Sequence, residues 1–149
     1  MLKLVTRGKL IVLEGLDRSG KSSVTKSIRE QLVASGLQAI DMNFPDRASP
    51  IGQIINSYLS SKAEINNETI HLLFSANRWE NMPKIDRLLA EGISIICDRY
   101  WYSGVAYSCA KGMDYEWCVA PDRGLIQPDL VIYLRADPDV LRGRSNYGE

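Results

Sequence analysis

The chain alternates between short apolar runs and longer stretches that carry apolar residues on one face. Short, mostly apolar runs predict strands at 10–14, 38–43, 93–98 and 129–134, of which those at 10–14 and 93–98 are expected to be buried. Apolar residues three and four positions apart predict helices at about 22–35, 50–59, 68–90 and 103–111. Strands that alternate with helices favour an α/β fold, with a parallel sheet, right-handed crossovers and helices on both faces.

Several predicted helix ends carry local signals. Ser49 and Pro50 suit the N-cap and first position of a helix, and Gly36 suits the residue just after one. Pro83 is predicted to bend or divide the long helix at 68–90, and a further helix is expected to begin at Asp137. Because no repeat or Gly/Ser-rich linker interrupts the pattern, we expect residues 1–149 to form a single domain.

Charge and composition narrow the classes of partner. The 149 residues are 45% hydrophobic and 24% charged, which is typical of a globular protein. Lys and Arg together number 18, and so do Asp and Glu, which leaves no net field to attract nucleic acid or an acidic membrane. Any anion must therefore be held by a local site, and we expect neither nucleic acid nor a membrane as a partner.

Cysteine usage and apolar run length bear on the compartment. Cys97, Cys109 and Cys118 are odd in number and lack C-x-x-C spacing, which favours reduced thiols over disulfides or a zinc site. The apolar runs are far shorter than the roughly 18 residues that span a bilayer, and no signal-peptide pattern opens the chain. We expect a cytoplasmic protein, with a nuclear location also open.

Residues 15–22 form a glycine-rich loop between the first predicted strand and the first predicted helix. They match G-x-x-x-x-G-K-[ST] at every fixed position. In such a loop successive backbone N–H groups turn inward around phosphate oxygens, and the helix N-terminus adds a positive end. We therefore expect an ATP-binding segment made of Gly15, Leu16, Asp17, Arg18, Ser19, Gly20, Lys21, Ser22 and Ser23.

Three side chains are candidates for handling the phosphates and their metal. Lys21 is expected at the β- and γ-phosphates, and the Ser22 hydroxyl at Mg²⁺. Asp98 ends the third predicted strand, where a carboxylate can reach the same Mg²⁺; an ion pair or helix cap at the strand end is the alternative. The base-reading N-K-x-D of GTPases does not occur in the sequence.

Four motifs follow one another from about Lys9 to the end of the chain. They are residues 15–22, Phe44-Pro-Asp-Arg47, Leu72-Leu-Phe-Ser-Ala-Asn-Arg-Trp-Glu80, and Asp98-Arg-Tyr100 followed by Ser103-Gly104. In residues and spacing they resemble thymidylate kinases, most closely those of eukaryotes and poxviruses. The resemblance implies a P-loop kinase fold and transfer of a phosphoryl group from ATP to thymidine monophosphate (dTMP), giving dTDP for pyrimidine deoxynucleotide synthesis, with Mg²⁺ as cofactor.

The strand-end positions of these motifs agree with the resemblance. In an open parallel sheet, ligands bind beyond the carboxyl ends of the strands. The loop at 15–22, the segment 44–47 and Asp98 each follow a predicted strand, so they are expected to meet in one crevice. Phe74 and Arg78, four apart on a predicted helix, share a face and pair a flat ring with a fork of donors, as a stacked base would require.

The resemblance also implies a role for each acceptor-side residue. Phe74 would stack on thymine and Arg78 would reach its carbonyl oxygen, while Tyr107 would exclude a 2′-hydroxyl. The remaining residues of the implied site are Phe44, Gly104, the acceptor-phosphate pair Arg47 and Arg99, Asp17 near the acceptor sugar and phosphate, and Arg18 at the transferring group. The implied catalytic set is Asp17, Arg18, Lys21, Asp98 and Arg99.

Simpler interpretations exist for several of these residues. Phe74 and Tyr107 could be packed helix aromatics, and Arg47 and Arg99 could be surface ion-pair members. His71, the only histidine, is expected to be structural. Two other functions stay open: another nucleoside monophosphate kinase, and a non-catalytic nucleotide-binding protein.

Two implications of the resemblance concern assembly and the C-terminal part. The family implies a homodimer built from helices that include the one at 68–90. Family members are longer than this chain, so residues 142–149, with Arg144 as an ATP contact, would be the first half of a lid that is cut there. A fifth strand is expected beyond the end, and a chain that stops at Glu149 is expected to be a poor kinase.

Overall fold

A single parallel sheet organises the protein. The computed structural model describes residues 6–137, in which four strands lie in the order β2-β3-β1-β4. The strands are β1 (Leu10–Gly15), β2 (Ala39–Asn43), β3 (Ser94–Asp98) and β4 (Leu130–Leu134). All four predicted strands are confirmed to within one residue at each end. The central strands β1 and β3 are mostly buried, whereas the edge strands β2 and β4 are partly exposed.

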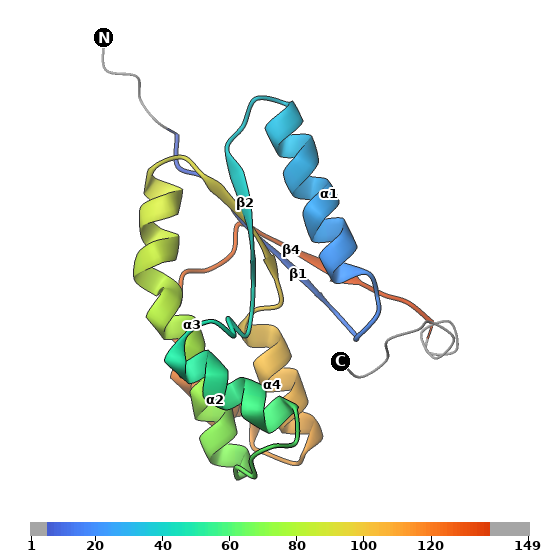
Figure 1. Ribbon diagram of the computed structural model, residues 1–149, viewed down its shortest axis with the longest axis vertical. Coiled ribbons are helices and arrows are strands. Elements are labelled where there is room, and N and C mark those ends of the chain that lie inside the picture. Colours follow the sequence, from blue (N-terminus) through green and yellow to red (C-terminus); the bar gives the residue numbers. More distant parts are fainter. Residues whose placement is uncertain (1–5, 138–149) are drawn as a thin grey trace.

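Helices cover the two faces of the sheet. They are α1 (Lys21–Ala34), α2 (Pro50–Leu59), α3 (Asn67–Ala90), α4 (Trp101–Ala110) and α5 (Tyr115–Val119), with a short 3₁₀ helix η1 (Ala120–Asp122). Figure 1 shows α1 on one side of the sheet and α3 on the other, with α2 and α4 packed near the lower half of α3. The predicted α/β architecture is confirmed, whereas α5 and η1 were not predicted.

Side chains from alternate strand positions fill the core beneath α3. Leu10 and Val12 of β1 are fully buried there with Ile95 of β3, and Ile85 and Leu89 of α3 close the cluster. Leu13 and Ile96 point to the opposite face of the sheet and are also fully buried. Both faces of the central strands are therefore covered.

The helix α3 continues through Pro83, so it is not divided there, which was one of the two outcomes that the sequence predicted. It is assigned as one helix from Asn67 to Ala90. Pro83 lies on an exposed face, while its neighbours Met82 and Ile85 are buried in the core. Helix stability in proteins comes mostly from packing of the apolar face, so this burial offsets the hydrogen bond that proline cannot donate.

Local capping signals are confirmed. The Ser49 hydroxyl accepts a hydrogen bond from the Gly52 backbone N–H at 2.9 Å at the start of α2. Gly36 has φ of 82° just after the end of α1, a conformation that favours glycine. The helix expected to begin at Asp137 lies almost entirely outside the described residues, and so does the lid segment at 142–149.

Two further expectations can be compared with the structure. Cys97, Cys109 and Cys118 are free cysteines, as the sequence predicted. Among residues 6–137, no helix combines the length and the apolar character needed to cross a membrane.

Candidate functional site

The predicted site residues gather at the carboxyl ends of neighbouring strands. Parallel pairing sets Leu13 of β1 and Asn43 of β2 opposite Asp98, the last residue of β3. The segments that leave these strands therefore begin at one edge of the sheet, as the position of ligands in open α/β sheets requires.

The glycine-rich loop turns directly from β1 into α1. Gly20 caps α1 with φ of 94°, and a Cβ atom on Gly15 would lie 2.5 Å from the Leu134 carbonyl oxygen. Lys21, the first residue of α1, is buried, and its Nζ donates to the Leu16 carbonyl oxygen at 2.7 Å. Burial, and then the nearby Arg99 guanidinium, lower the pKa of Lys21. The ammonium group is therefore held inside the loop where phosphates would enter.

The two predicted metal-binding residues are in contact. The Ser22 hydroxyl donates to the Asp98 carboxylate at 2.7 Å across the gap between α1 and the end of β3. Within residues 6–137 no three His, Cys, Asp or Glu side chains form a metal-binding group. A site with one hydroxyl and one carboxylate suits Mg²⁺, which keeps several waters and takes phosphate oxygens as ligands.

Asp17, Arg99 and Tyr107 form a hydrogen-bonded group beside the loop. Arg99 pairs with Asp17 at 2.5 Å, and the Tyr107 hydroxyl donates to the second Asp17 oxygen at 3.3 Å. Arg99 has φ of 68°, and its Nη1 also donates to the Ser103 hydroxyl at 2.9 Å. Burial raises the pKa of Tyr107, so its hydroxyl remains a donor. The structure thus brings together three residues that the sequence placed near the acceptor sugar and phosphate.

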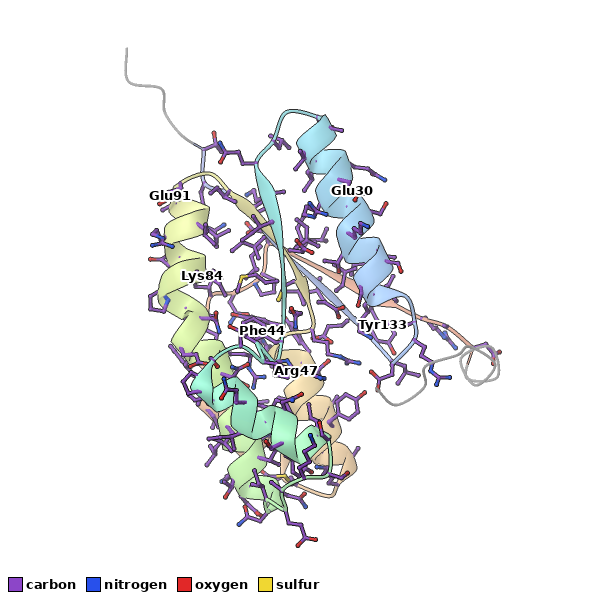
Figure 2. All side chains as sticks on the ribbon, in the orientation of Figure 1. Glu30, Phe44, Arg47, Lys84, Glu91 and Tyr133 are labelled. Atoms are coloured by element: carbon purple, nitrogen blue, oxygen red, sulfur yellow. The ribbon has the colours of Figure 1, made fainter. Side chains whose placement is uncertain are left out.

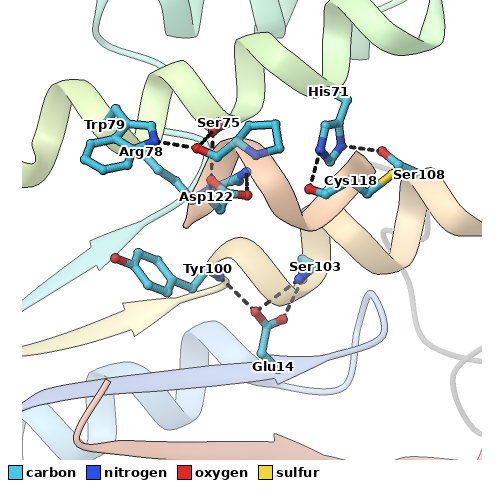
Figure 3. Close-up of polar contacts among 11 residues, drawn as sticks. Glu14, His71, Ser75, Arg78, Trp79, Tyr100, Ser103, Ser108, Cys118 and Asp122 are labelled. Atoms are coloured by element: carbon cyan, nitrogen blue, oxygen red, sulfur yellow. Dashed lines mark hydrogen bonds and ion pairs between the residues drawn. The ribbon is translucent and has the colours of Figure 1, made fainter. Parts of the chain in front are cut away.

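Arg78 occupies a buried position on α3. Its guanidinium donates to both carboxylate oxygens of Asp122, from Nε at 2.9 Å and from Nη2 at 2.7 Å (Figure 3). On the other side it faces Gly104 of α4, where a Cβ atom would lie 3.1 Å from Nη2. Phe74, one turn earlier on α3, is half-buried and is not part of the hydrophobic core cluster.

The segment after β2 carries two residues of the expected substrate site, Phe44 and Arg47. The Phe44 side chain lies in the hydrophobic core with its ring centroid 5.8 Å from that of Tyr100, so a direct contact of this ring with a substrate is not supported. Arg47 is exposed and donates to the Asn56 side chain of α2 at 3.1 Å rather than joining Arg99. Both residues lie close to the start of α2 (Figure 2). The physical reason is that Phe44 is the large apolar residue that closes the core beneath this segment.

The other predicted ATP-binding residues line the loop or the first turn of α1. Leu16 and Ser23 are exposed, and Arg18 has φ of 63° within the loop. Arg144 lies outside the described residues.

Two acids that the sequence reasoning missed support the site. Glu14 is 6% exposed and accepts hydrogen bonds from the Tyr100 and Ser103 backbone N–H groups at 2.9 and 3.3 Å. It thereby caps α4, which has no side-chain cap of its own. Asp122 is the partner of Arg78. A carboxylate at the end of a buried strand is uncommon, and that was the one available signal for Glu14.

His71 of α3 forms hydrogen bonds to α4 and α5 and is not among the predicted site residues. Its Nδ1 lies 2.7 Å from the Ser108 hydroxyl of α4, and its Nε2 lies 2.8 Å from the Cys118 carbonyl oxygen of α5. Full burial with both nitrogens hydrogen-bonded agrees with the structural role that the sequence suggested.

The glycine-rich loop between β1 and α1 places Lys21 and Ser22 near Asp98, the acid at the end of the neighbouring strand. This arrangement defines the class of P-loop nucleotide-binding proteins. The thymidylate kinase family model matches residues 13–149. The chain belongs to the thymidylate kinase family.

Individual relatives agree with this assignment. The chain is 53% identical over 144 residues to the thymidylate kinase of Plasmodium falciparum, covering 96% of this chain and 69% of that protein. It is 43% identical over 145 residues to a putative thymidylate kinase of Invertebrate iridescent virus 6, covering 97% of this chain and 68% of that protein. The solved structure of the Candida albicans thymidylate kinase superposes with a TM-score of 0.89 at 40% identity, covering 96% and 69%. The resemblance drawn from the four motifs is confirmed.

Proposed function

We propose that this chain transfers the γ-phosphoryl group of ATP to dTMP, giving dTDP and ADP. One observation supports the proposal beyond family membership: adjacent residues in the first turn of α4 contact Arg99 and Arg78. Ser103 accepts a hydrogen bond from Arg99 at 2.9 Å, while the next residue, Gly104, faces Arg78. An acceptor nucleotide could therefore reach Arg99 with its phosphate and Arg78 with its base.

The donor side is built by the glycine-rich loop. Its backbone N–H groups and the N-terminus of α1 favour the β- and γ-phosphates, and Lys21 supplies the neutralising charge. Arg18 would act on the transferring phosphoryl group. Burial, first among the causes, lowers the pKa of Lys21, and the negative charge of a bound polyanion would favour the charged form of this side chain.

Ser22 and Asp98 are the residues that would hold Mg²⁺. Their oxygens already meet at 2.7 Å, so a cation could replace the shared hydrogen with little movement of either side chain. When bound, the ion neutralises charge that develops on the phosphoryl oxygens.

The acceptor side follows from the remaining groups. Phe74 would stack on thymine and Arg78 would donate to its carbonyl oxygen. Arg99, with Arg47, would hold the acceptor phosphate, and Tyr107 would lie against the deoxyribose.

The proposed reaction depends on how the protein positions the two nucleotides, and no protein side chain forms a covalent bond to the phosphoryl group. The attacking oxygen belongs to a phosphate that is largely ionised near pH 7, so no general base is needed to deprotonate it. The bond from the γ-phosphorus to the ADP oxygen breaks as the bond to the dTMP oxygen forms. Lys21 and Arg18 would stabilise the charge on the transferring group, and Arg99 would keep the two anions in line.

We also propose that the protein forms a homodimer through α2 and α3. Leu72 and Trp79, seven positions apart on α3, are 46% and 40% exposed, and Ile54 and Leu59 of α2 are 47% and 45% exposed. Apolar side chains gathered on two adjacent helices suit a two-fold symmetric interface. A strict monomer in sedimentation at micromolar concentration would contradict this proposal.

The proposed reaction is tested by assaying ADP formation with dTMP, dUMP, dCMP, CMP and AMP as acceptors. We expect dTMP to be the preferred acceptor and Lys21→Ala to remove turnover. Lys26→Ala, in which an exposed lysine of the same helix is changed, is the matched control. Preference for another monophosphate, or ATP binding without turnover of any of them, would refute the proposed reaction.

A further inference from the structure

Three side chains of α3 form hydrogen bonds to the short segment that carries Asp122: Ser75, Arg78 and Trp79. The Trp79 indole N–H donates to the Pro121 carbonyl oxygen at 2.7 Å. The Ser75 hydroxyl lies within hydrogen-bonding distance of both the Pro121 carbonyl oxygen, at 3.2 Å, and the Asp122 carboxylate, at 2.8 Å. Figure 3 shows these contacts on the same stretch of helix that presents Arg78. Asp122 is therefore fixed before any ligand arrives.

The Arg78–Asp122 ion pair is shielded from water. Asp122 contacts only one edge of the Arg78 guanidinium. The two side chains are 3% and 1% exposed. Asp122 accepts from Nε and Nη2, which form the inner edge of the fork. No hydrogen bond among the described residues uses Nη1 of Arg78, so the outer edge keeps donors for a ligand.

The outer edge of Arg78 faces a position without a side chain. A Cβ atom on Gly104 would lie 3.1 Å from Nη2 and 3.3 Å from Nη1. The guanidinium could not retreat from such an atom without leaving the carboxylate of Asp122. Glycine at position 104 thus leaves no side chain against the outer edge, and the carboxylate at position 122 holds that edge in one orientation.

We propose that Asp122 is a positioning residue that orients Arg78 and so sets the preference for a pyrimidine with a carbonyl group over one with an amino group. This inference rests on the proposed function, in which Arg78 meets the base. Guanidinium groups only donate hydrogen bonds, so a fixed outer edge can donate to a carbonyl oxygen but has no acceptor for the amino group of cytosine. Pairing with Asp122 cancels the charge of Arg78, which leaves hydrogen-bond geometry as the basis of selection.

The test is calorimetric titration of dTMP, dCMP and ATP into the parent chain and Asp122→Asn. Asparagine has the shape of aspartate, but it carries no charge, and only its Oδ1 can accept a hydrogen bond from Arg78. We expect dTMP affinity to fall at least about tenfold, the effect of losing one charge-assisted hydrogen bond, while ATP affinity stays within about twofold. The ratio of dTMP to dCMP affinity should fall with it.

Glu116→Gln is the matched control. It removes a carboxylate from a nearby ion pair with Arg123, in which both side chains are mostly exposed, at 69% and 63%. This variant should leave dTMP affinity and the affinity ratio unchanged. An equal loss of dTMP affinity in Glu116→Gln would overturn the specific role of Asp122.

A double variant keeps the inference testable if Asp122→Asn folds poorly. Arg78→Met combined with Asp122→Asn leaves no unpaired buried charge. If Asp122 acts only through Arg78, the double variant should bind dTMP as weakly as Arg78→Met alone. A further drop in the double variant, or unchanged dTMP affinity in folded Asp122→Asn, would overturn the inference. If the parent itself neither binds nor phosphorylates dTMP, the proposed function fails instead.

Discussion

The proposed base-binding region around Arg78 and the proposed phosphate-binding region around Arg99 are joined by one turn of α4, yet their ion pairs differ in exposure. In the base region, Arg78 and Asp122 are 3% and 1% exposed and share two hydrogen bonds. In the phosphate region, Arg99 is 17% exposed and its partner Asp17 is 55% exposed. The first pair is enclosed by protein, whereas the second opens to solvent where a nucleotide would lie.

This difference separates two modes of recognition. Separating a buried ion pair leaves an uncompensated charge and costs several kcal/mol, so the Arg78 pair should persist when substrate binds. A partly exposed pair contributes about 1 kcal/mol or less, so Arg99 can exchange Asp17 for a phosphate group. The base would be recognised by a preformed geometry, and the phosphates by exchange of existing contacts.

Lys21→Ala should have the largest effect on turnover. Removing a preorganised charge from the transferring phosphoryl group costs about 3 kcal/mol or more, so kcat should fall at least about a hundredfold. The melting temperature should change little, as expected for the phosphate region. The measurement is kcat with dTMP and Mg·ATP beside a thermal melt, and an unchanged kcat in the folded variant would show that the loop is misassigned.

Arg78→Met and Arg99→Met should separate the two regions by stability. Arg78→Met leaves Asp122 buried and unpaired, so the free energy of unfolding should fall by about 3 kcal/mol. Arg99→Met leaves an exposed Asp17, and its loss should stay below about 1 kcal/mol. Urea denaturation measures both values. Equal losses would mean that the two pairs do not differ as their burial suggests.

Tyr107→Ala should affect sugar selection without disturbing the base region. If its bulk excludes a 2′-hydroxyl, the variant should lose about 1 to 2 kcal/mol of discrimination against a ribose acceptor. Tyr107→Phe keeps the ring and removes only the 3.3 Å hydrogen bond to Asp17, so it should retain most of the discrimination. The kcat/KM ratio for dTMP and its ribose counterpart decides the matter, and identical ratios in all three proteins would make Tyr107 a packing residue.

Asp129→Asn provides a reference far from both regions, at the other end of the sheet. Burial raises the pKa of Asp129, but hydrogen bonds from the Leu10 backbone N–H, Arg7 and Lys9 outweigh it and bring the pKa to about 2. A depressed carboxyl pKa stabilises the fold above the unfolded value near 3.9, and this stability is lost as pH falls toward 2.

The expected loss in Asp129→Asn is about 1 kcal/mol at pH 7, reduced from the full pKa shift because the side chain stays partly exposed. As pH falls to about 2 and below, the variant and the parent should converge. A stability difference that persists at pH 2 would show that the hydrogen bonds, not the charge, account for the effect.

Local sequence signals were sufficient for the sheet and the phosphate loop. The strands are contiguous apolar runs, and the spacing from Gly15 to Ser22 has a mechanism that operates within eight residues. The loop motif therefore predicted that Lys21 lies at the start of α1, and the strand pattern predicted that Asp98 ends the neighbouring strand.

Long-range partners could not be predicted in this way. Asp122 meets Arg78 across 44 positions, and Glu14 meets Tyr100 across 86, with no periodicity to connect them. The packing of the Phe44 ring in the core is likewise a long-range contact that its motif did not indicate, and its role at the substrate stays a prediction. The five-residue helix α5 is too short for a repeating apolar pattern; Asp114, which accepts from the Trp117 N–H, was its only signal.

The most direct test of the two-mode account is calorimetric titration of dTMP and ATP into the parent chain and Arg78→Met. The account predicts that dTMP affinity falls at least about tenfold in the variant, while ATP affinity stays within about twofold, because only the acceptor meets the base region. A loss of ATP affinity with unchanged dTMP affinity would contradict it, since Arg78 would then belong to the donor side.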